Sequence, residues 1–85
     1  MIWRVVLGNH AEKKLRRFPR KEKLRIAETI EALRSAPFAG DVVKLGGMGN
    51  AWRLRVGNYR IIFELFSKER MLFISEIVRR TSATY

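Results

Sequence analysis

The amino-acid sequence predicts a single-domain α+β fold, in which an opening strand and a two-helix hairpin precede a three-stranded antiparallel meander. A chain of 85 residues can build one modest hydrophobic core and no second one. Between residues 9 and 35 the apolar side chains recur at helical spacing, whereas from residue 51 they alternate with polar ones, as in a strand. Elements in this order pack their helices on one face of the sheet. We therefore expect one domain over residues 1–85.

The first 35 residues are predicted to form one strand and two helices. Residues 2–7 are rich in β-branched and aromatic side chains, which favour a strand. Asn9 is a suitable N-cap for the first helix, with Glu12 at the reciprocal capping position. Pro19 ends this helix at Phe18 and suits the start of the next, which we expect to end near Ser35. The core-facing stripe of the second helix is expected to contain Leu24, Ala27, Ile30 and Leu33, with Ile26 beside them.

The rest of the chain is predicted to form a loop and three strands. Residues 36–50 are rich in glycine, with only Val42, Val43 and Leu45 able to reach the core, so this segment is expected to be mostly loop. Residues 51–56 and 59–66 show the period of two typical of strands, and the turn dipeptide Gly57-Asn58 separates them. A polar connection at 67–70 leads to a third strand at 71–78, and a basic tail follows.

The composition indicates a polyanionic partner. Eighteen Lys and Arg against eight Asp and Glu give a net charge of +10 on a small body. The chain has no cysteine and a single histidine, His10, so we expect no metal site and no cofactor. No segment has the pattern of a signal peptide or approaches the ~20 apolar residues of a membrane span. We therefore expect a soluble cytoplasmic protein that does not bind membranes.

The central hairpin predicts a surface rich in arginine. If Gly57-Asn58 is the whole turn, Arg55 lies opposite Arg60 and Arg53 opposite Ile62, and opposed residues share a face of the sheet. We call the side that gathers Arg53, Arg55 and Arg60 the arginine face. The other side carries the apolar residues that would cover the helices, namely Trp52, Leu54, Val56, Tyr59, Ile61 and Phe63.

The arginine face is predicted to bind an anion. Like charges that oppose each other across two strands destabilise a sheet by up to ~1 kcal/mol, so stability alone does not favour this arrangement. A bridging phosphate reverses the sign of the interaction, and a planar guanidinium can bind two phosphate oxygens at once. The alternative is a solvated basic surface whose charge is partly offset by Glu64, which lies on the same side of the predicted strand as Arg60.

The last strand is predicted to add Arg79 to the arginine face. A four-residue connection pairs Phe66 with Met71, and position 79 then has the parity of Arg60. The same register leaves Glu76 on the helix side, and a slip of one residue would send Arg79 to that side as well.

Eight further cations on the predicted helices form a separate basic cluster. Their summed charge can steer the protein toward nucleic acid, with an affinity that falls as salt rises. His10 is interpreted as a first-turn helix residue, because acid–base catalysis by histidine would need a second one. The cluster contains Lys13, Lys14, Arg16, Arg17, Arg20, Lys21, Lys23 and Arg25.

The segment from Trp52 to Glu64, WRLRVGNYRIIFE, follows Lys44-Leu-Gly-Gly and precedes the closing run Val78-Arg-Arg-Thr-Ser-Ala-Thr-Tyr85. With the order of strand, two helices and strands, this pattern resembles the RelE/ParE superfamily of type II toxin-antitoxin toxins along essentially the whole chain. RelE-like members are ribosome-dependent endoribonucleases that cleave mRNA, whereas ParE-like members inhibit DNA gyrase. Many relatives carry Gly-His before the arginine of the last strand, where this chain has Ile77-Val78.

The resemblance implies a set of site residues for the ribonuclease branch, which we favour. Arg53 and Arg55 match substrate-binding positions, and Arg60, Arg79 and Tyr85 match catalytic positions. The implied reaction is attack of the ribose 2'-hydroxyl on the adjacent phosphate without a metal, with arginines stabilising the developing charge. Tyr85 would act as general base once neighbouring cations lower its pKa from ~10.

The resemblance also leaves alternatives open. Glu64 is either a second candidate proton acceptor or a salt-bridge partner of Arg55 or Arg60. The implied partners are a cognate antitoxin, in a toxin–antitoxin hetero-oligomer, and mRNA on the ribosome. The competing functions are gyrase inhibition and a catalytically silent module that binds antitoxin or nucleic acid.

Overall fold

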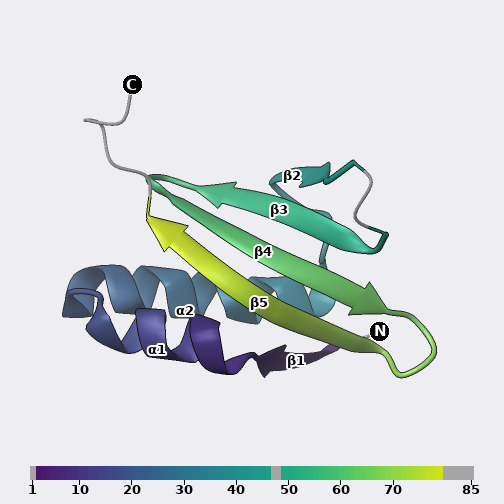
Figure 1. Ribbon diagram of the computed structural model, residues 1–85, viewed down its shortest axis with the longest axis horizontal. Helices are drawn as coiled ribbons and strands as arrows, with labels where there is room; N and C mark the ends of the chain where they lie inside the picture. The colour runs from purple at the N-terminus through teal and green to yellow at the C-terminus, as the bar shows by residue number, and fades with distance from the viewer. Residues whose placement is uncertain (1, 47–48, 80–85) are drawn as a thin grey trace.

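The computed structural model describes residues 2–46 and 49–79, which form two helices and five strands (Figure 1). The helices cover one side of the sheet, and the last three strands form the predicted antiparallel meander (Figure 1). The predicted α+β class is confirmed. In chain order the elements are β1 (Arg4–Leu7), α1 (Asn9–Arg17), α2 (Arg20–Ser35), β2 (Asp41–Lys44), β3 (Ala51–Val56), β4 (Tyr59–Phe66) and β5 (Met71–Arg79).

The strands form one mixed sheet in the order β1-β5-β4-β3-β2. β1 pairs in parallel with β5, and the other neighbouring strands pair antiparallel. β1 begins two residues later than its sequence suggested, because the backbone N–H of Trp3 donates to the carbonyl of Arg34 at 2.8 Å instead of continuing the ladder with β5. The opening strand therefore joins the sheet at one edge, next to the last strand of the chain.

The segment predicted to be mostly loop contains the edge strand β2. Its four residues pair with β3 at the opposite edge of the sheet from β1. Val42 lies opposite Leu54 and packs against the core, whereas the next residue, Val43, is exposed. The sequence did not predict this strand within the loop segment, because pairing with β3 orders residues whose own glycine-rich surroundings do not favour a strand.

α1 begins one residue earlier than its capping pattern suggested. Gly8 is the N-cap, Asn9 is the first helical residue, and no side chain caps the helix. The N–H of Gly8 donates to the carbonyl of Ile74 at 2.8 Å, and the carbonyl of Gly8 accepts from the N–H of Glu12 at 2.9 Å. The predicted capping pair of Asn9 and Glu12 was wrong, because β5 fixes the backbone of the residue before Asn9.

α2 turns three of its five predicted core residues toward the core, but not Leu24 or Ala27. Leu24 was expected in the core but is 59% exposed. On the core-facing side of α2, Glu22 accepts a hydrogen bond from the Tyr59 hydroxyl of β4 at 2.5 Å. The stripe that follows Glu22 at helical spacing is the one in contact with the core. It contains Ile26, Ile30 and Leu33.

The hydrophobic core lies between the helices and the covered side of the sheet. Tyr59, Ile61 and Phe63 are all buried, as the alternation along β4 predicts. Trp52 is partly buried and makes an edge-to-face contact with the ring of Phe38, with the ring centroids 4.8 Å apart. Within the described ranges, neither helix is long and apolar enough to cross a lipid bilayer.

Candidate nucleic-acid interface

The arginine face lies on β3 and β4, on the side of the sheet away from the core. The hairpin pairs Arg55 with Arg60 and Arg53 with Ile62, so the predicted register is confirmed. Gly57 enters the turn with a φ of 56°, a left-handed conformation that glycine adopts at low energy. The two-residue turn is therefore what brings the three arginines to one surface.

Arg55 has one neighbour of each charge across the sheet. On the β2 side it lies opposite Asp41, and its Nε is 3.7 Å from Asp41 Oδ2. On the β4 side it lies opposite Arg60. Both members of the Asp41–Arg55 ion pair are substantially exposed, so solvent weakens their attraction. Sequence reasoning missed Asp41, because the strand that positions it was predicted to be loop.

Arg53 and Arg60 each contain a buried hydrogen-bond donor without an acceptor. The Nε atoms of both guanidinium groups are shielded from solvent, and no group among the described residues accepts their hydrogens. A buried donor left unpaired costs about 1–3 kcal/mol. The terminal nitrogens of a guanidinium can offer two parallel N–H bonds to one oxyanion, and three guanidinium groups share this side of the hairpin. The geometry therefore favours anion binding at the arginine face.

Glu64 lies on the same side of the sheet, farther along β4. It is half-buried and lies opposite Ala51 on β3 and Phe73 on β5. Four residues of extended strand separate it from Arg60, a distance of about 13 Å between backbone positions. Within the described ranges, no ion pair joins Glu64 to Arg55 or Arg60. The salt-bridge interpretation of Glu64 was therefore wrong.

The last strand changes register before it reaches the arginine face. Ser75 is an extra residue in a β-bulge opposite Ile62, and its hydroxyl donates to the Ile62 carbonyl at 3.3 Å. Beyond the bulge the pairing is shifted by one residue, so Arg79 lies opposite Tyr59. The prediction that Arg79 shares the face of Arg60 was wrong, because the bulge gives it the parity of a core-facing residue.

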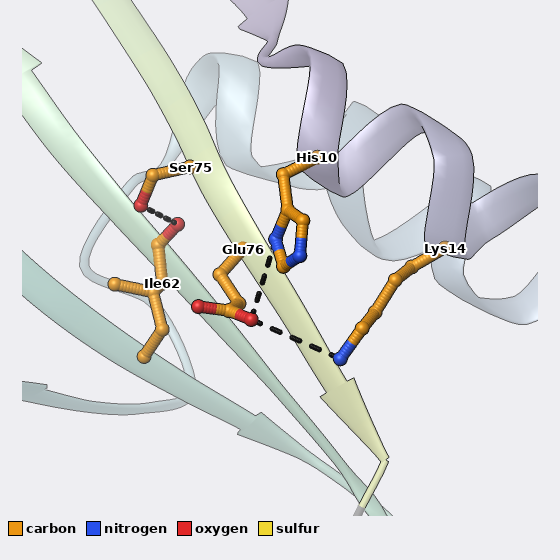
Figure 2. A network of polar contacts seen from close by, with 5 residues as sticks. All are labelled: His10, Lys14, Ile62, Ser75 and Glu76. Atoms are coloured by element: carbon orange, nitrogen blue, oxygen red, sulfur yellow. Dashed lines mark hydrogen bonds and ion pairs between the residues drawn. The ribbon is translucent and has the colours of Figure 1, made fainter.

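Glu76 follows the bulge and links β5 to α1 (Figure 2). Its Oε1 lies 3.4 Å from His10 Nδ1 and 3.8 Å from Lys14 Nζ. Because Glu76 lies beyond the bulge, it is opposite Ile62 and has the parity of the arginine face, so the predicted helix-side parity was wrong. Its carboxylate nevertheless contacts α1, and all three side chains stay in contact with solvent. His10 lies in the first turn of α1, so its interpretation as a helix residue is confirmed.

Tyr59 forms a second polar cluster, on the helix side of the sheet. Its hydroxyl donates to Glu22, and its ring centroid lies 4.9 Å from that of Phe18. Removal from water raises the pKa of Tyr59 above its ordinary value of 10.0, and both the hydrogen bond and the charge of Glu22 act in the same direction. The charges of Arg79 and Arg25 lower that pKa, with a smaller effect. Sequence reasoning placed Tyr59 in the core but had no signal for this partner.

The described residues thus hold the predicted site residues in two groups. Arg53, Arg55 and Arg60 share the arginine face, whereas Arg79 lies at the end of β5 with the parity of the opposite side. Tyr85, the remaining predicted catalytic residue, lies outside the described residues.

The sequence matches a family of known proteins over nearly its whole length. Residues 5–83 match the family described as the ParE toxin of the type II toxin-antitoxin system parDE. A protein named as toxin RelE1 in Methanocaldococcus jannaschii is 27% identical over 86 residues, covering 98% of this chain and 96% of that protein.

The structure is similar to those of RelE toxins. A chain of the archaeal RelE–RelB complex from Pyrococcus horikoshii OT3 aligns with a TM-score of 0.83 and 29% identity, covering 96% of this chain and 99% of that one. The isolated RelE toxin of E. coli shares the fold, with a TM-score of 0.80 and 14% identity over 96% of this chain and 88% of that one.

Fold, site and sequence together define a toxin of the RelE/ParE superfamily of type II toxin-antitoxin systems. The chain belongs to the ParE toxin family. Within the superfamily its sequence and structural relatives are RelE-like.

Proposed function

We propose that this toxin is a metal-independent, ribosome-dependent mRNA endoribonuclease and that the arginine face binds its substrate. The observation that carries the proposal is the grouping of three arginines, Arg53, Arg55 and Arg60, on one side of the β3–β4 hairpin. Phosphate oxygens suit guanidinium groups in charge and geometry, because the planar fork of a guanidinium can bind two oxygens at once. The similarity to archaeal RelE sequences supports the choice of RNA as the source of the phosphate.

In the proposed reaction the ribose 2'-oxygen forms a bond to the adjacent phosphorus, and the bond from phosphorus to the 5'-oxygen breaks. The products are a 2',3'-cyclic phosphate and a 5'-hydroxyl end. The proton of the 2'-hydroxyl passes to a general base, and the departing 5'-oxygen gains a proton. Arg60 and Arg53 stabilise the charge that develops on the non-bridging oxygens, and Arg55 binds a neighbouring phosphate.

Two residues are proposed as the general base. Tyr85 has this role by resemblance to the ribonuclease branch. Glu64 is the alternative, supported by its place on the arginine side of β4 without an ion pair to the nearby arginines of the described chain. Replacing Tyr85 by Phe and Glu64 by Gln distinguishes them, because only loss of the true base removes the limb of the pH–rate profile that reports its ionisation.

The proposed activity is tested by adding the purified toxin to translating ribosomes and mapping mRNA cleavage by primer extension. Arg60→Ala, Arg79→Ala and Tyr85→Phe are compared with wild type. Loss of one group that stabilises the transition state is expected to slow cleavage by about 10²-fold or more. Arg16→Ala is the matched control, because Arg16 is an exposed helix residue paired with Glu12. Undiminished cleavage by all three site variants would overturn the assignment.

Gyrase inhibition is the second candidate, and the match to the ParE toxin family favours it. A ParE-like toxin acts by binding gyrase and needs no RNA-cleaving residues. A supercoiling assay with purified gyrase and the toxin separates the two candidates directly. Inhibition that persists in Arg60→Ala, together with no cleavage of mRNA by the wild type, would replace the ribonuclease proposal with this one.

We also propose a cognate antitoxin as the partner that holds the toxin inactive. Similar structures include RelE–RelB complexes from Pyrococcus horikoshii and from Methanococcus jannaschii. A net charge of +10 suits an antitoxin segment with acidic residues. Co-expression with the neighbouring small open reading frame, followed by size-exclusion chromatography of the complex, tests this partner.

A further inference from the structure

Arg55 differs from the other two arginines of the arginine face in having an acidic partner. Its Nε lies 3.7 Å from Asp41 Oδ2, whereas the Nε atoms of Arg53 and Arg60 have no acceptor among the described residues. The difference follows from the sheet order, because β2 lies next to β3 at the edge and sets Asp41 directly opposite Arg55 (Figure 1). One arginine is therefore neutralised while two are not.

We propose that Asp41 competes with RNA phosphate for Arg55 and so sets how strongly the arginine face binds RNA. This inference rests on the proposed function of that face. In the free toxin the carboxylate occupies Arg55, and RNA binds first through Arg53 and Arg60. A phosphate held in register then displaces the carboxylate and takes Arg55 as its third contact.

The geometry of the ion pair makes this displacement easy. At 3.7 Å the pair is long, and the side chains of Asp41 and Arg55 keep 52% and 43% of their exposure. Exposed ion pairs of this kind contribute little. A phosphate offers a guanidinium two oxygens in its own plane and is the stronger partner.

The charge on the other flank of Arg55 explains why a carboxylate is useful there. Arg60 lies directly opposite Arg55, and two unscreened guanidinium groups in that relation repel each other. Asp41 reduces this repulsion while RNA is absent. Because bound phosphate does the same, the carboxylate becomes dispensable once the substrate is bound. Asp41 is thus a positioning residue that selects for RNA able to reach all three arginines.

The test measures binding of a fluorescein-labelled single-stranded RNA oligonucleotide to the purified toxin by anisotropy, over a series of NaCl concentrations. Asp41→Asn is expected to bind roughly 1.5-fold to fivefold more tightly than wild type, the range set by loss of one exposed ion pair. The slope of log K against log salt should stay close to the wild-type value, because RNA reaches the same three arginines in both proteins.

Two variants separate this effect from a general gain of positive charge. Glu31→Gln removes an exposed carboxylate that pairs with Arg34 at 3.2 Å on α2, so it changes the net charge equally at a distance. The double variant Asp41→Asn with Arg55→Ala should bind no more tightly than Arg55→Ala alone, because Asp41 acts through Arg55. Asp41→Ser serves in place of Asp41→Asn if thermal melting shows that the latter is unfolded.

The outcomes distinguish the two proposals. If Arg53→Ala with Arg60→Ala binds RNA as tightly as wild type, the arginine face is not the RNA surface and the proposed function fails. If that double variant loses binding but Asp41→Asn behaves like Glu31→Gln, only the role of Asp41 is overturned. A gain from Asp41→Asn that persists without Arg55 also overturns it.

Discussion

Arg79 lies opposite Tyr59 at the end of the β4–β5 ladder, with the parity of the helix-facing side of the sheet. The bulge at Ser75 causes this placement, since an unbulged strand would give Arg79 the parity of Arg60. The charge of Arg79 acts on the Tyr59 hydroxyl, whose hydrogen bond goes to Glu22 on α2. The resemblance places Arg79 in one site with Arg60, but the two residues therefore lie on opposite sides of the sheet.

We expect Arg79→Ala to raise the pKa of Tyr59 further, because the positive charge of Arg79 lowers it in the wild type. The ultraviolet absorbance of ionised tyrosine, followed during an alkaline titration, measures the change. Tyr59→Phe identifies which of the two tyrosine steps belongs to Tyr59. Arg4→Ala is the matched control, because Arg4 contacts Met71 at the far end of β5. An equal pKa of Tyr59 in Arg79→Ala and in wild type would contradict the placement of Arg79 near Tyr59.

Tyr59→Phe is expected to destabilise the fold by about 1–3 kcal/mol, the range for a hydrogen bond to a charged group. The pKa of Tyr59 is raised in the folded state, so its contribution is fully present below the unfolded value of ~10 and is lost as pH rises through the higher folded value. The stability gap between wild type and Tyr59→Phe should therefore be constant near neutral pH and shrink in alkali.

Urea unfolding at a series of pH values measures this gap. Glu22→Gln is the control, because the amide oxygen still accepts from the Tyr59 hydroxyl while the negative charge is lost. Its destabilisation should be smaller than that of Tyr59→Phe at neutral pH. A gap between wild type and Tyr59→Phe that widens above pH ~10 would contradict the raised pKa.

The sequence predicted the arginine face correctly because one local signal determines it. A two-residue turn fixes the register of its own hairpin, and alternation along each strand then decides which side every residue faces. Arg55 opposite Arg60 follows from those two facts alone. No contact with a distant segment is needed.

The features that the sequence did not predict all depend on distant contacts. The bulge that moves Arg79 is the extra residue Ser75. The charge of the next residue, Glu76, indicates an irregular strand but does not say where the pairing shifts. β2 is ordered by β3 and brings Asp41 to Arg55. On α2 the sequence correctly placed Ile26, Ile30 and Leu33 at the core but also placed Leu24 there, and it gave no sign that Glu22 bonds to Tyr59.

Gly8→Ala is expected to destabilise the toxin by about 1–3 kcal/mol, as overpacking does in a tight core. A Cβ on Gly8 would lie 2.8 Å from Phe73 Cζ and 3.1 Å from the backbone oxygen of Ile74. The oxygen accepts the Gly8 N–H, so it cannot move away without loss of that bond. Gly46→Ala is the matched control, because a Cβ there has no neighbour within 4 Å. Equal loss of thermal stability in both variants would contradict the role of this contact.

Arg60→Met is expected to stabilise the free toxin by about 0.2–1 kcal/mol while it weakens RNA binding. The substitution keeps an apolar stem of similar length but removes the charge that opposes Arg55 and the buried Nε that lacks an acceptor among the described residues. Urea unfolding without RNA measures the first effect, and anisotropy measures the second. Arg34→Met on α2, outside the basic cluster and paired with Glu31, is the control for loss of one positive charge, and it should change neither quantity in this way.

Salt and phosphate test whether the stability gain of Arg60→Met comes from relief of charge repulsion. Salt screens the repulsion between Arg55 and Arg60, so the gain in unfolding free energy of Arg60→Met over wild type should shrink as NaCl rises. The part of that gain that comes from removing the buried Nε should not change with salt. By the proposed function, inorganic phosphate should bind the folded wild type at the arginine face and reverse the order of stability, because a ligand specific to the folded state stabilises it by mass action. If Arg60→Met destabilises the free toxin, the packing of Arg60 outweighs its repulsion with Arg55. If phosphate stabilises both proteins equally, the arginine face does not bind phosphate through Arg60.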